Sequence, residues 1–324
     1  MRAERVLVIK ARALGDTLLA TPALTALRRG LPGARITAVV SPAGRDVLEG
    51  NPDVDEVRVY DKHACGLGHS LRFMRGLAAG GFDLAVALHA SFRTALLARA
   101  SGARVRVVHN HSGRNHFATL DIPFKKESKS TIERDLDTVR TLGLPSCGNT
   151  LVFPVNDAAW GGAKEFLAAN RLSANRYLVL IPGAGKARKR WTANAAAAFI
   201  DSIAQPLPLP WVVLAGPAER ELAAAIQARA GRKLPVFSRG LKEAGALLGL
   251  SCGAVTTDSG PKHVAVAMNT PTLTLWTDEP EAEWHPYPLA KHALLRSATG
   301  AVPDLVPADV IEAALRHFSA VWNT

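Results

Sequence analysis

The sequence is poor in cysteine and has no long apolar run, and both absences exclude classes of protein. Its 324 residues include only Cys65, Cys147 and Cys252, which lie far apart without a C-x-x-C pair. Neither a disulfide framework nor a zinc site is expected. The first apolar run, Val6 to Ile9, ends at Lys10, and no other stretch approaches ~20 uncharged apolar residues. We therefore expect a cytoplasmic protein.

Several nucleotide-binding and nucleic-acid-binding signatures are also missing. The G-x-x-x-x-G-K-S/T spacing of a P-loop is absent, and no G-x-G-x-x-G follows the first expected strand. Aromatic residues make up only 6% of the chain, and neither a stacking aromatic platform nor an RNA-recognition motif is evident. These absences weigh against a P-loop NTPase, a dehydrogenase and an RNA-binding protein.

The composition that is present describes a soluble globular protein with a basic surface. Hydrophobic residues make up 48% and charged residues 21%, and the formal net charge is +11. This charge favours polyanionic partners such as nucleotides, phosphorylated glycolipids, nucleic acid or an anionic membrane surface. Charge alone does not choose among them. A chain of this length accommodates two domains.

Short apolar runs alternate with helical periodicity in two successive series. The first series begins at Val6 and runs to Val108, and the second begins at Tyr177 and runs to Trp276. Such alternation predicts an α/β fold with parallel sheets covered by helices on both faces. We place the domains at residues 1–155 and 156–324. The last helix, at about residues 309–322, is a candidate to pack back on the first domain.

Polar or glycine-bearing loops follow four of the expected strands. Ligands bind open α/β sheets at the carboxyl ends of strands, so these loops are the candidate site. Two domains that face each other would place the first loop opposite the other three. The loops are Lys10 to Asp16, Pro182 to Trp191, Gly216 to Glu219 and Asp258 to His263.

The most specific of these loops lies between an apolar run and a helical segment. Asp258, Ser259 and Gly260 form a turn, and Pro261 suits the first position of a helix. The glycine admits a ligand close to the backbone, and the helix N-terminus favours an anion. The alternative is that Asp258 and Ser259 merely cap the helix.

The other loops have equally plain alternatives. Asp16 either caps a helix or, kept ionised by the helix dipole, acts as a base. The loop from Pro182 to Trp191 is either a solvated basic loop or a phosphate cradle to which Lys189 brings a charge. Glu219 either favours a helix dipole or holds a ribose diol.

Taken together, the motifs resemble glycosyltransferase family 9, the ADP-heptose:lipopolysaccharide heptosyltransferases. The similarity covers nearly the whole chain in the same order: K-x-R-x-x-G-D, P-G-A with K-R-W, G-P-x-E, and D-S-G-P-x-H-x-A-x-A followed by P-T. The resemblance implies a GT-B fold of two Rossmann-like domains around a central cleft. It implies an inverting, metal-independent transfer of heptose from ADP-heptose to an inner-core sugar of lipopolysaccharide.

The resemblance also implies roles for individual residues. Asp16 matches the catalytic base, and no metal site or cofactor is implied beyond the ADP-sugar substrate. The N-terminal domain would bind the acceptor and the C-terminal domain the donor. The enzyme would act as a monomer at the inner face of the inner membrane, without binding nucleic acid. The implied donor-binding residues are Lys189, Glu219, Asp258, Ser259, Gly260 and His263.

Charge suggests where a phosphorylated acceptor would bind. Lys10, Arg12 and Arg114 are the candidate contacts, the last of them within a basic segment from His109 to Lys129. The alternative for this segment is an ordinary solvated basic face.

One departure from the family pattern affects the choice of donor. Thr277-Asp278-Glu279 stands after Trp276, where relatives often have a glycine. A family member that uses another nucleotide sugar or another glycan acceptor is therefore an alternative. A non-catalytic binder of a nucleotide sugar or of nucleic acid is a second one.

Overall fold

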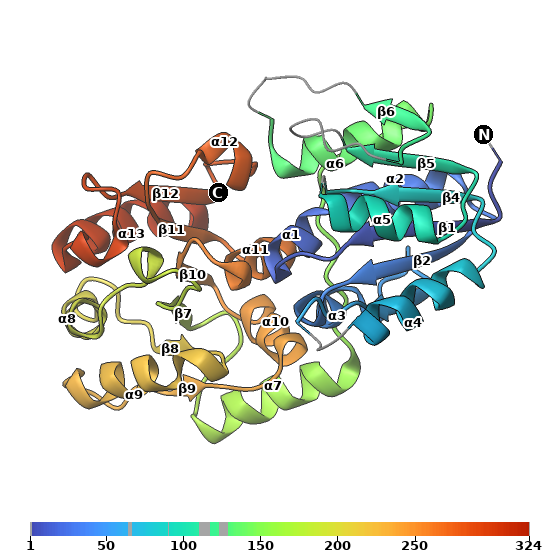
Figure 1. Ribbon diagram of the computed structural model, residues 1–324. Coiled ribbons are helices and arrows are strands. Elements are labelled where there is room, and N and C mark those ends of the chain that lie inside the picture. The colour runs from blue at the N-terminus through green and yellow to red at the C-terminus, as the bar shows by residue number, and fades with distance from the viewer. Residues whose placement is uncertain (1, 64–66, 90, 110–116, 123–128, 324) are drawn as a thin grey trace. The chain divides into compact units, whose positions relative to one another are not determined.

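The computed structural model describes residues 2–63, 67–89, 91–109, 117–122 and 129–323 (Figure 1). Its contacts divide the chain into two compact units. Unit 1 comprises Met1–Pro154 and Ala282–Pro286, and unit 2 comprises Val155–Glu281 and Tyr287–Thr324. The division along the chain falls after residue 154, beside the boundary expected from the sequence. No helix of the described residues combines the length and apolarity that crossing a bilayer requires.

Unit 1 is built on a six-stranded parallel sheet in the order β3-β2-β1-β4-β5-β6. This is the doubly wound order of a Rossmann domain, in which the strand order reverses between β1 and β4. The strands read as short apolar runs because both faces of the sheet are covered. They are β1 (Arg5–Lys10), β2 (Arg35–Val40), β3 (Glu56–Val59), β4 (Leu84–Ala87), β5 (Val105–His109) and β6 (Leu120–Ile122).

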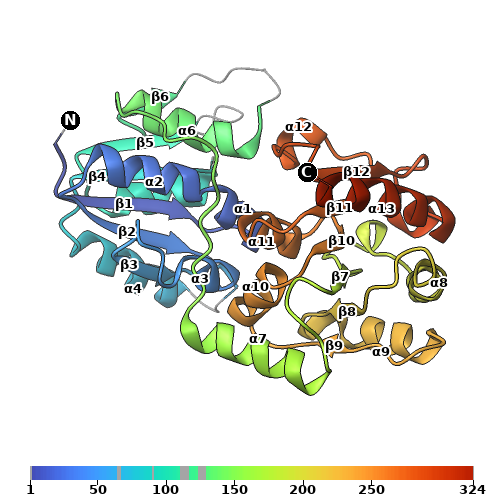
Figure 2. The ribbon, with the colours of Figure 1, turned by 180° about the vertical axis from the view of Figure 1, so that it is seen from behind.

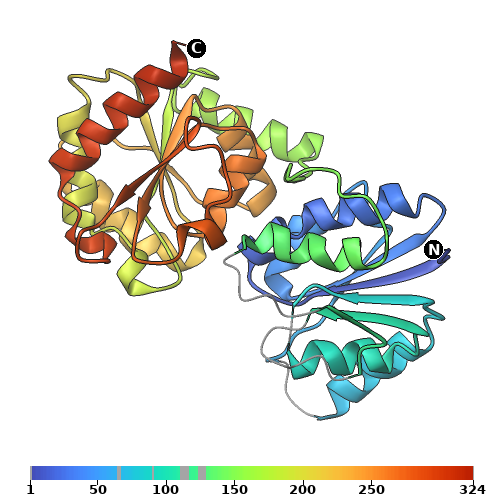
Figure 3. The same cartoon turned by 90° about the horizontal axis from the view of Figure 1, so that it is seen from above.

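Helices cover both faces of this sheet, with α2 and α6 on one face and α4 and α5 on the other (Figure 3). The helical segment after β1 is divided into two helices that meet at Ala20. Pro22 explains the break, since it has no N–H to donate to the preceding turn. The helices are α1 (Leu14–Leu19), α2 (Thr21–Gly30), α3 (Pro42–Leu48), α4 (Leu67–Ala78), α5 (Phe92–Ala100) and α6 (Thr131–Thr141).

Unit 2 repeats the same architecture. Its parallel sheet has the order β12-β11-β10-β7-β8-β9, so the strand order reverses between β7 and β10. β7, β8, β10 and β11 are buried along their whole length. β12 was not expected from the sequence. The strands are β7 (Leu178–Ile181), β8 (Trp211–Leu214), β9 (Val236–Phe237), β10 (Gly253–Thr257), β11 (Thr272–Trp276) and β12 (His292–Arg296).

The helices of unit 2 form two packed groups. α10 lies beside α7 in both views of the fold (Figures 1 and 2), and α10 also contacts α11. α8 packs against α9 and α13, and Phe318 of α13 is buried in the core of this unit. The helices are α7 (Asp157–Ala169), α8 (Ala193–Ile203), α9 (Arg220–Arg229), α10 (Leu241–Gly249), α11 (Gly260–Ala267), α12 (Glu281–Trp284) and α13 (Pro307–Trp322).

The α/β fold class with two parallel sheets, predicted from the alternating pattern, is confirmed. Two elements that position polar side chains are 3₁₀ turns: η1 (Ala187–Lys189) after β7 and η2 (Pro217–Glu219) after β8. A third, η3 (Val302–Asp304), precedes α13. The first two lie in the loops that follow the carboxyl ends of their strands, at the edge of the sheet where ligands bind in this architecture.

Candidate functional site

The carboxyl ends of β7, β10 and β11 bring charged side chains together in unit 2. β7 and β10 are neighbours in the sheet and flank the point where the strand order reverses. The hydroxyl of Thr257 at the end of β10 donates to the carbonyl of Gly183, 2.5 Å away in the loop after β7. This bond ties the two loops to each other. The side chains that follow these strands form what we call the donor cluster: Lys186, Arg188, Lys189, Asp258, Lys262, Asp278 and Glu279.

Asp258 is the centre of this cluster. One carboxylate oxygen lies 2.5 Å from the Nζ of Lys189, and the other lies 2.6 Å from the Nζ of Lys262. Its side chain is only 6% exposed. Burial alone would raise the pKa of Asp258. The charge of Lys262 and the hydrogen bonds from both lysines outweigh burial and hold that pKa well below its usual value. Asp258 is therefore ionised at neutral pH.

The sequence indicates Lys262 as a cation beside the predicted anion site, but the donor-binding residues implied by the resemblance do not include it. Lys262 is fully buried, one helical turn after Asp258, and its ammonium lies 4.7 Å from the ring centroid of Trp276. Burial lowers the pKa of Lys262, while the Asp258 carboxylate opposes that shift. Asp258 lies just before the N-cap of α11 and Lys262 lies in its first turn, so the spacing of four residues was a signal that the two side chains could meet.

Glu279 joins the donor cluster from the loop after β11. Its Oε1 lies 2.7 Å from Arg188 Nη2, 3.1 Å from Lys186 Nζ and 3.4 Å from Lys189 Nζ. Although burial opposes ionisation, the contacts with Lys186 and Lys189 keep the pKa of Glu279 below its usual value. Its carbonyl accepts a bond from the indole of Trp276 at 2.9 Å. The segment that departs from the family pattern, Thr277-Asp278-Glu279, therefore binds the basic loop after β7 through ion pairs.

The helix-capping alternative for Asp258 and Ser259 is wrong. Ser259 occupies the N-cap position of α11, but no side chain caps that helix. The Ser259 hydroxyl instead points back to the carbonyl of Thr257 at 3.4 Å, and the Asp258 carboxylate binds the two lysines. Gly260 and Pro261 begin the helix as expected.

His263 is buried on the next position of α11, in contact with Tyr287. Its Nδ1 lies 2.5 Å from the Tyr287 hydroxyl, and the two rings meet edge to face. Burial and the nearby charge of Asp258 raise the pKa of Tyr287 well above its usual value, so this phenol stays neutral. Tyr287 is a residue that sequence reasoning missed, since its partner is 24 positions away.

Glu219 lies against the loop after β7. A Cβ at Gly183 would come within 2.3 Å of the Glu219 Cγ, and one at Gly216 within 2.7 Å of its Oε2. Glycine at both positions thus leaves room for this carboxylate. Glu219 sits at the N-terminus of α9, and no side chain forms a capping hydrogen bond there.

In unit 1 a buried ion pair lies at the end of β1, where the strand order reverses between β1 and β4. Lys10 Nζ lies 2.6 and 2.8 Å from the two carboxylate oxygens of Asp135 and 3.2 Å from the carbonyl of Leu88. Burial raises the pKa of Asp135 to about 6, against the opposing charge of Lys10. Lys10 is 4% exposed. The predicted acceptor contact of Lys10 needs correction, because its ammonium is buried and bound to Asp135 within the fold.

Asp16 lies in the first turn of α1, whose N-cap is Ala13. The helix-cap alternative for Asp16 is therefore wrong. Its carboxylate is 14% exposed and lies 3.6 Å from the Nε of Arg12, which is itself 44% exposed. Asp16 also adds negative potential at Asp135. The structure thus leaves Asp16 and Arg12 reachable from solvent.

The third predicted acceptor contact, Arg114, lies outside the described residues, as does most of the basic segment around it. Lys129, at the end of that segment, pairs with Asp137 at 2.9 Å. Among the residues that the structure describes, no group of His, Cys, Asp and Glu is arranged to hold a metal ion.

Two doubly wound parallel sheets in one chain are the GT-B fold, which the chain shares with solved heptosyltransferases. The chain belongs to glycosyltransferase family 9. The family model described as "Glycosyltransferase family 9 (heptosyltransferase)" matches residues 70–314, well over half of its length. The protein is therefore a glycosyltransferase of the heptosyltransferase family.

Individual relatives agree with this assignment. The chain is 26% identical over 288 residues to lipopolysaccharide heptosyltransferase 3 of Escherichia coli, covering 84% of this chain and 83% of the relative. Its fold matches a family 9 glycosyltransferase of Veillonella parvula with a TM-score of 0.86 at 23% identity, covering 98% and 97% of the two chains. It matches E. coli ADP-heptose lps heptosyltransferase II with a TM-score of 0.79 at 21% identity, covering 97% and 98%.

Proposed function

We propose that the protein transfers heptose from ADP-heptose to an inner-core sugar of lipopolysaccharide, with inversion and without a metal ion. The observation that carries the proposal is the cluster of Lys189, Asp258 and Lys262 at the strand-order reversal of unit 2. A cationic group beside a helix N-terminus suits a diphosphate. The choice of heptose as the sugar and of lipopolysaccharide as the acceptor rests on the names of the relatives.

Leaving-group stabilisation follows from the charges in unit 2. The ADP that departs develops negative charge, and fixed positive groups lower the energy of that state most when they need no rearrangement. Lys189 is already oriented by Asp258, and His263 is oriented by Tyr287. In this proposal Asp258 and the backbone near Ser259 and Gly260 bind the sugar and the diphosphate.

The acceptor hydroxyl requires a base, and Asp16 is our candidate. Its carboxylate lies in the first turn of α1 and is partly exposed, so it can accept a proton from a hydroxyl placed beside it. Arg12, 3.6 Å away, is exposed enough to meet a phosphate of the acceptor. Glu219 is our candidate for the ribose diol. We further propose a monomer that works at the inner face of the inner membrane.

The test is an Asp16→Asn variant with Asp46→Asn, an exposed carboxylate of α3, as its matched control. Turnover of ADP-heptose should fall ~100-fold or more in the first variant, because general bases contribute at least that much. Binding of ADP, measured by calorimetry, should stay unchanged in both. Turnover of Asp16→Asn within tenfold of the parent would remove Asp16 as the base.

A second candidate function is supported by the donor cluster itself. Asp278 and Glu279 bring two carboxylates to the basic loop, within the segment that departs from the family pattern. This placement suits a donor sugar other than heptose. A panel of nucleotide sugars, tested for protection against thermal unfolding, separates the two candidates, since a ligand of the native state raises its stability. Stronger protection by a nucleotide sugar other than ADP-heptose would favour the second.

A further inference from the structure

Unit 1 presents two basic helices on one face of its sheet. α4 and α5 contact each other and cover the same face (Figure 3). Neither helix contains an Asp or a Glu. Their arginines are exposed and form no ion pair within the described ranges of the chain: Arg72 and Arg75 on α4, and Arg93 and Arg99 on α5. This face therefore carries positive charge that no carboxylate of the two helices compensates.

Large apolar side chains are exposed together with these arginines. Leu71 on α4 is 48% exposed, Phe92 at the start of α5 is 59% exposed, and Phe117 is 43% exposed. The ring centroids of Phe92 and Phe117 lie 6.4 Å apart. Because α4 and α5 follow the carboxyl ends of β3 and β4 in a parallel sheet, both helices begin at the same edge of that sheet. We call the three apolar side chains and the four arginines the basic apolar patch.

The exposed position of Phe117 is fixed by its backbone. Its φ of 68° is a left-handed conformation that bulky residues rarely adopt. The Nε of Arg106 donates a hydrogen bond to the Phe117 carbonyl at 2.7 Å and holds this conformation. Residues in such strained conformations cluster at sites that bind ligands. The ring is thus held at the surface, where a partner that covers it would remove apolar area from water.

Apolar side chains beside uncompensated cations suit the surface of an anionic bilayer. Proteins that lie on a membrane bury Phe or Leu side chains at the level of the headgroups, while Arg and Lys attract the anionic lipids. A single exposed apolar residue needs no partner, but a pair of exposed rings beside arginines is a different case. A surface that binds nucleic acid relies on base stacking, to which Leu71 contributes no ring.

We propose that the basic apolar patch docks the enzyme on the anionic surface of a lipid bilayer. In the docked state Leu71, Phe92 and Phe117 insert at the level of the headgroups, and the arginines bind lipid phosphates. This docking rests on the proposed location of the enzyme at a membrane, and it does not depend on the identity of the nucleotide sugar, the acceptor or the base.

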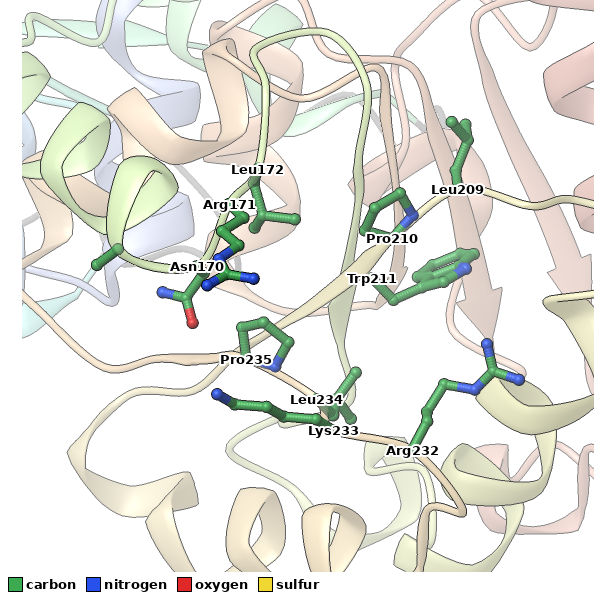
Figure 4. Close-up of a pocket in the computed structure, with 11 residues that line it drawn as sticks. Asn170, Arg171, Leu172, Leu209, Pro210, Trp211, Arg232, Lys233, Leu234 and Pro235 are labelled. Carbon is green, nitrogen blue, oxygen red and sulfur yellow. The ribbon is translucent and has the colours of Figure 1, made fainter.

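Unit 2 supplies a matched surface whose cations have no exposed large apolar neighbours. Arg171 and Lys233 line a pocket of about 700 Å³ (Figure 4). Both are exposed, whereas the leucines and Trp211 that line this pocket are partly or fully buried. Arg171→Gln/Lys233→Gln is therefore the control for the charge variant of the patch, Arg72→Gln/Arg93→Gln, since both variants remove two positive charges.

The apolar variant of the patch is Leu71→Ser/Phe92→Ser. Its control is Leu289→Ser/Val306→Ser, which changes two side chains of unit 2 that are 54% and 51% exposed. Circular dichroism verifies that each variant folds. Binding is measured by co-sedimentation of the full chain with phosphatidylcholine vesicles that contain or lack phosphatidylglycerol, without nucleotide sugar or acceptor. Transfer activity, which the Asp16→Asn comparison tests, can therefore fail while docking holds.

The parent should bind only the vesicles that contain phosphatidylglycerol, and added salt should weaken this binding. The charge variant should bind ~25-fold more weakly, since each arginine near an anionic surface contributes about fivefold. The apolar variant should bind ~5-fold more weakly, and both controls should bind within about twofold of the parent. Absence of vesicle binding, equal binding to both kinds of vesicle, or equal losses in patch variants and controls would overturn the proposal. Tighter binding to a single-stranded RNA, lost in the same patch variants, would also overturn it.

Discussion

Replacing one member of the Lys10–Asp135 pair should destabilise the protein far more than replacing both. The side chains are 5% and 2% exposed, and both carboxylate oxygens lie within 2.8 Å of the ammonium. Removing one partner leaves the other charge buried, which costs about 3–5 kcal/mol. For a folding unit of the size of unit 1, that corresponds to a fall in melting temperature of roughly 6–20 °C.

The double variant Lys10→Met/Asp135→Leu separates this explanation from simple loss of packing. Apolar side chains of similar volume avoid the desolvation cost of both charges, so its free energy of unfolding should lie within about 2 kcal/mol of the parent. The coupling between the two substitutions should therefore be large and favourable. Urea unfolding followed by circular dichroism measures all four proteins of the cycle.

An exposed ion pair supplies the control. Arg316 lies 3.7 Å from Glu312, and both side chains are more than 70% exposed. Arg316→Met should therefore change stability by less than about 1 kcal/mol. The reasoning is refuted if Lys10→Met costs no more than Arg316→Met, or if the double variant is as unstable as the sum of the two single variants.

Two further predictions concern donor binding and pH. Glu279→Gln removes a carboxylate that pairs with the cations of the basic loop, so these cations should bind ADP more strongly and its Kd should fall by ~5-fold. The exposed Glu312→Gln is the control, and calorimetry is the measurement. Weaker binding of ADP would show instead that Glu279 assists donor binding. Burial lowers the pKa of His317, outweighing its bonds to the backbone of Lys291 and Thr272. The unfolded chain therefore binds a proton at His317 more readily than the folded chain does. The stability of the fold is unaffected by the titration of His317 above about pH 6.5 and decreases as the pH falls below that value. His317→Leu should therefore lose less stability than the parent between pH 7.5 and 5.5 in urea titrations, and an equal loss would contradict the assignment.

Local signals in the sequence were sufficient to locate most strands and the loops that follow them. Buried parallel strands read as uninterrupted apolar runs, and Gly260-Pro261 marks a helix start because of the backbone freedom of one residue and the fixed φ of the other. β12 escaped notice because its apolar run, Ala293 to Leu295, is short and lies between two charged or polar residues, His292 and Arg296. The break at Ala20 was equally missed, although Pro22 was its visible cause.

The sequence by itself determined the α/β class, the two series of strands and the positions of the polar loops, because each depends on periodicity and on backbone preferences of neighbouring residues. Tertiary structure alone decided how the charges pair. Lys10 looks like a solvent-seeking cation in the sequence, yet it is buried against Asp135, 125 positions away. Glu279 meets Lys189 across 90 positions. Long-range pairs of this kind form only when the fold brings distant segments together, which no local pattern encodes.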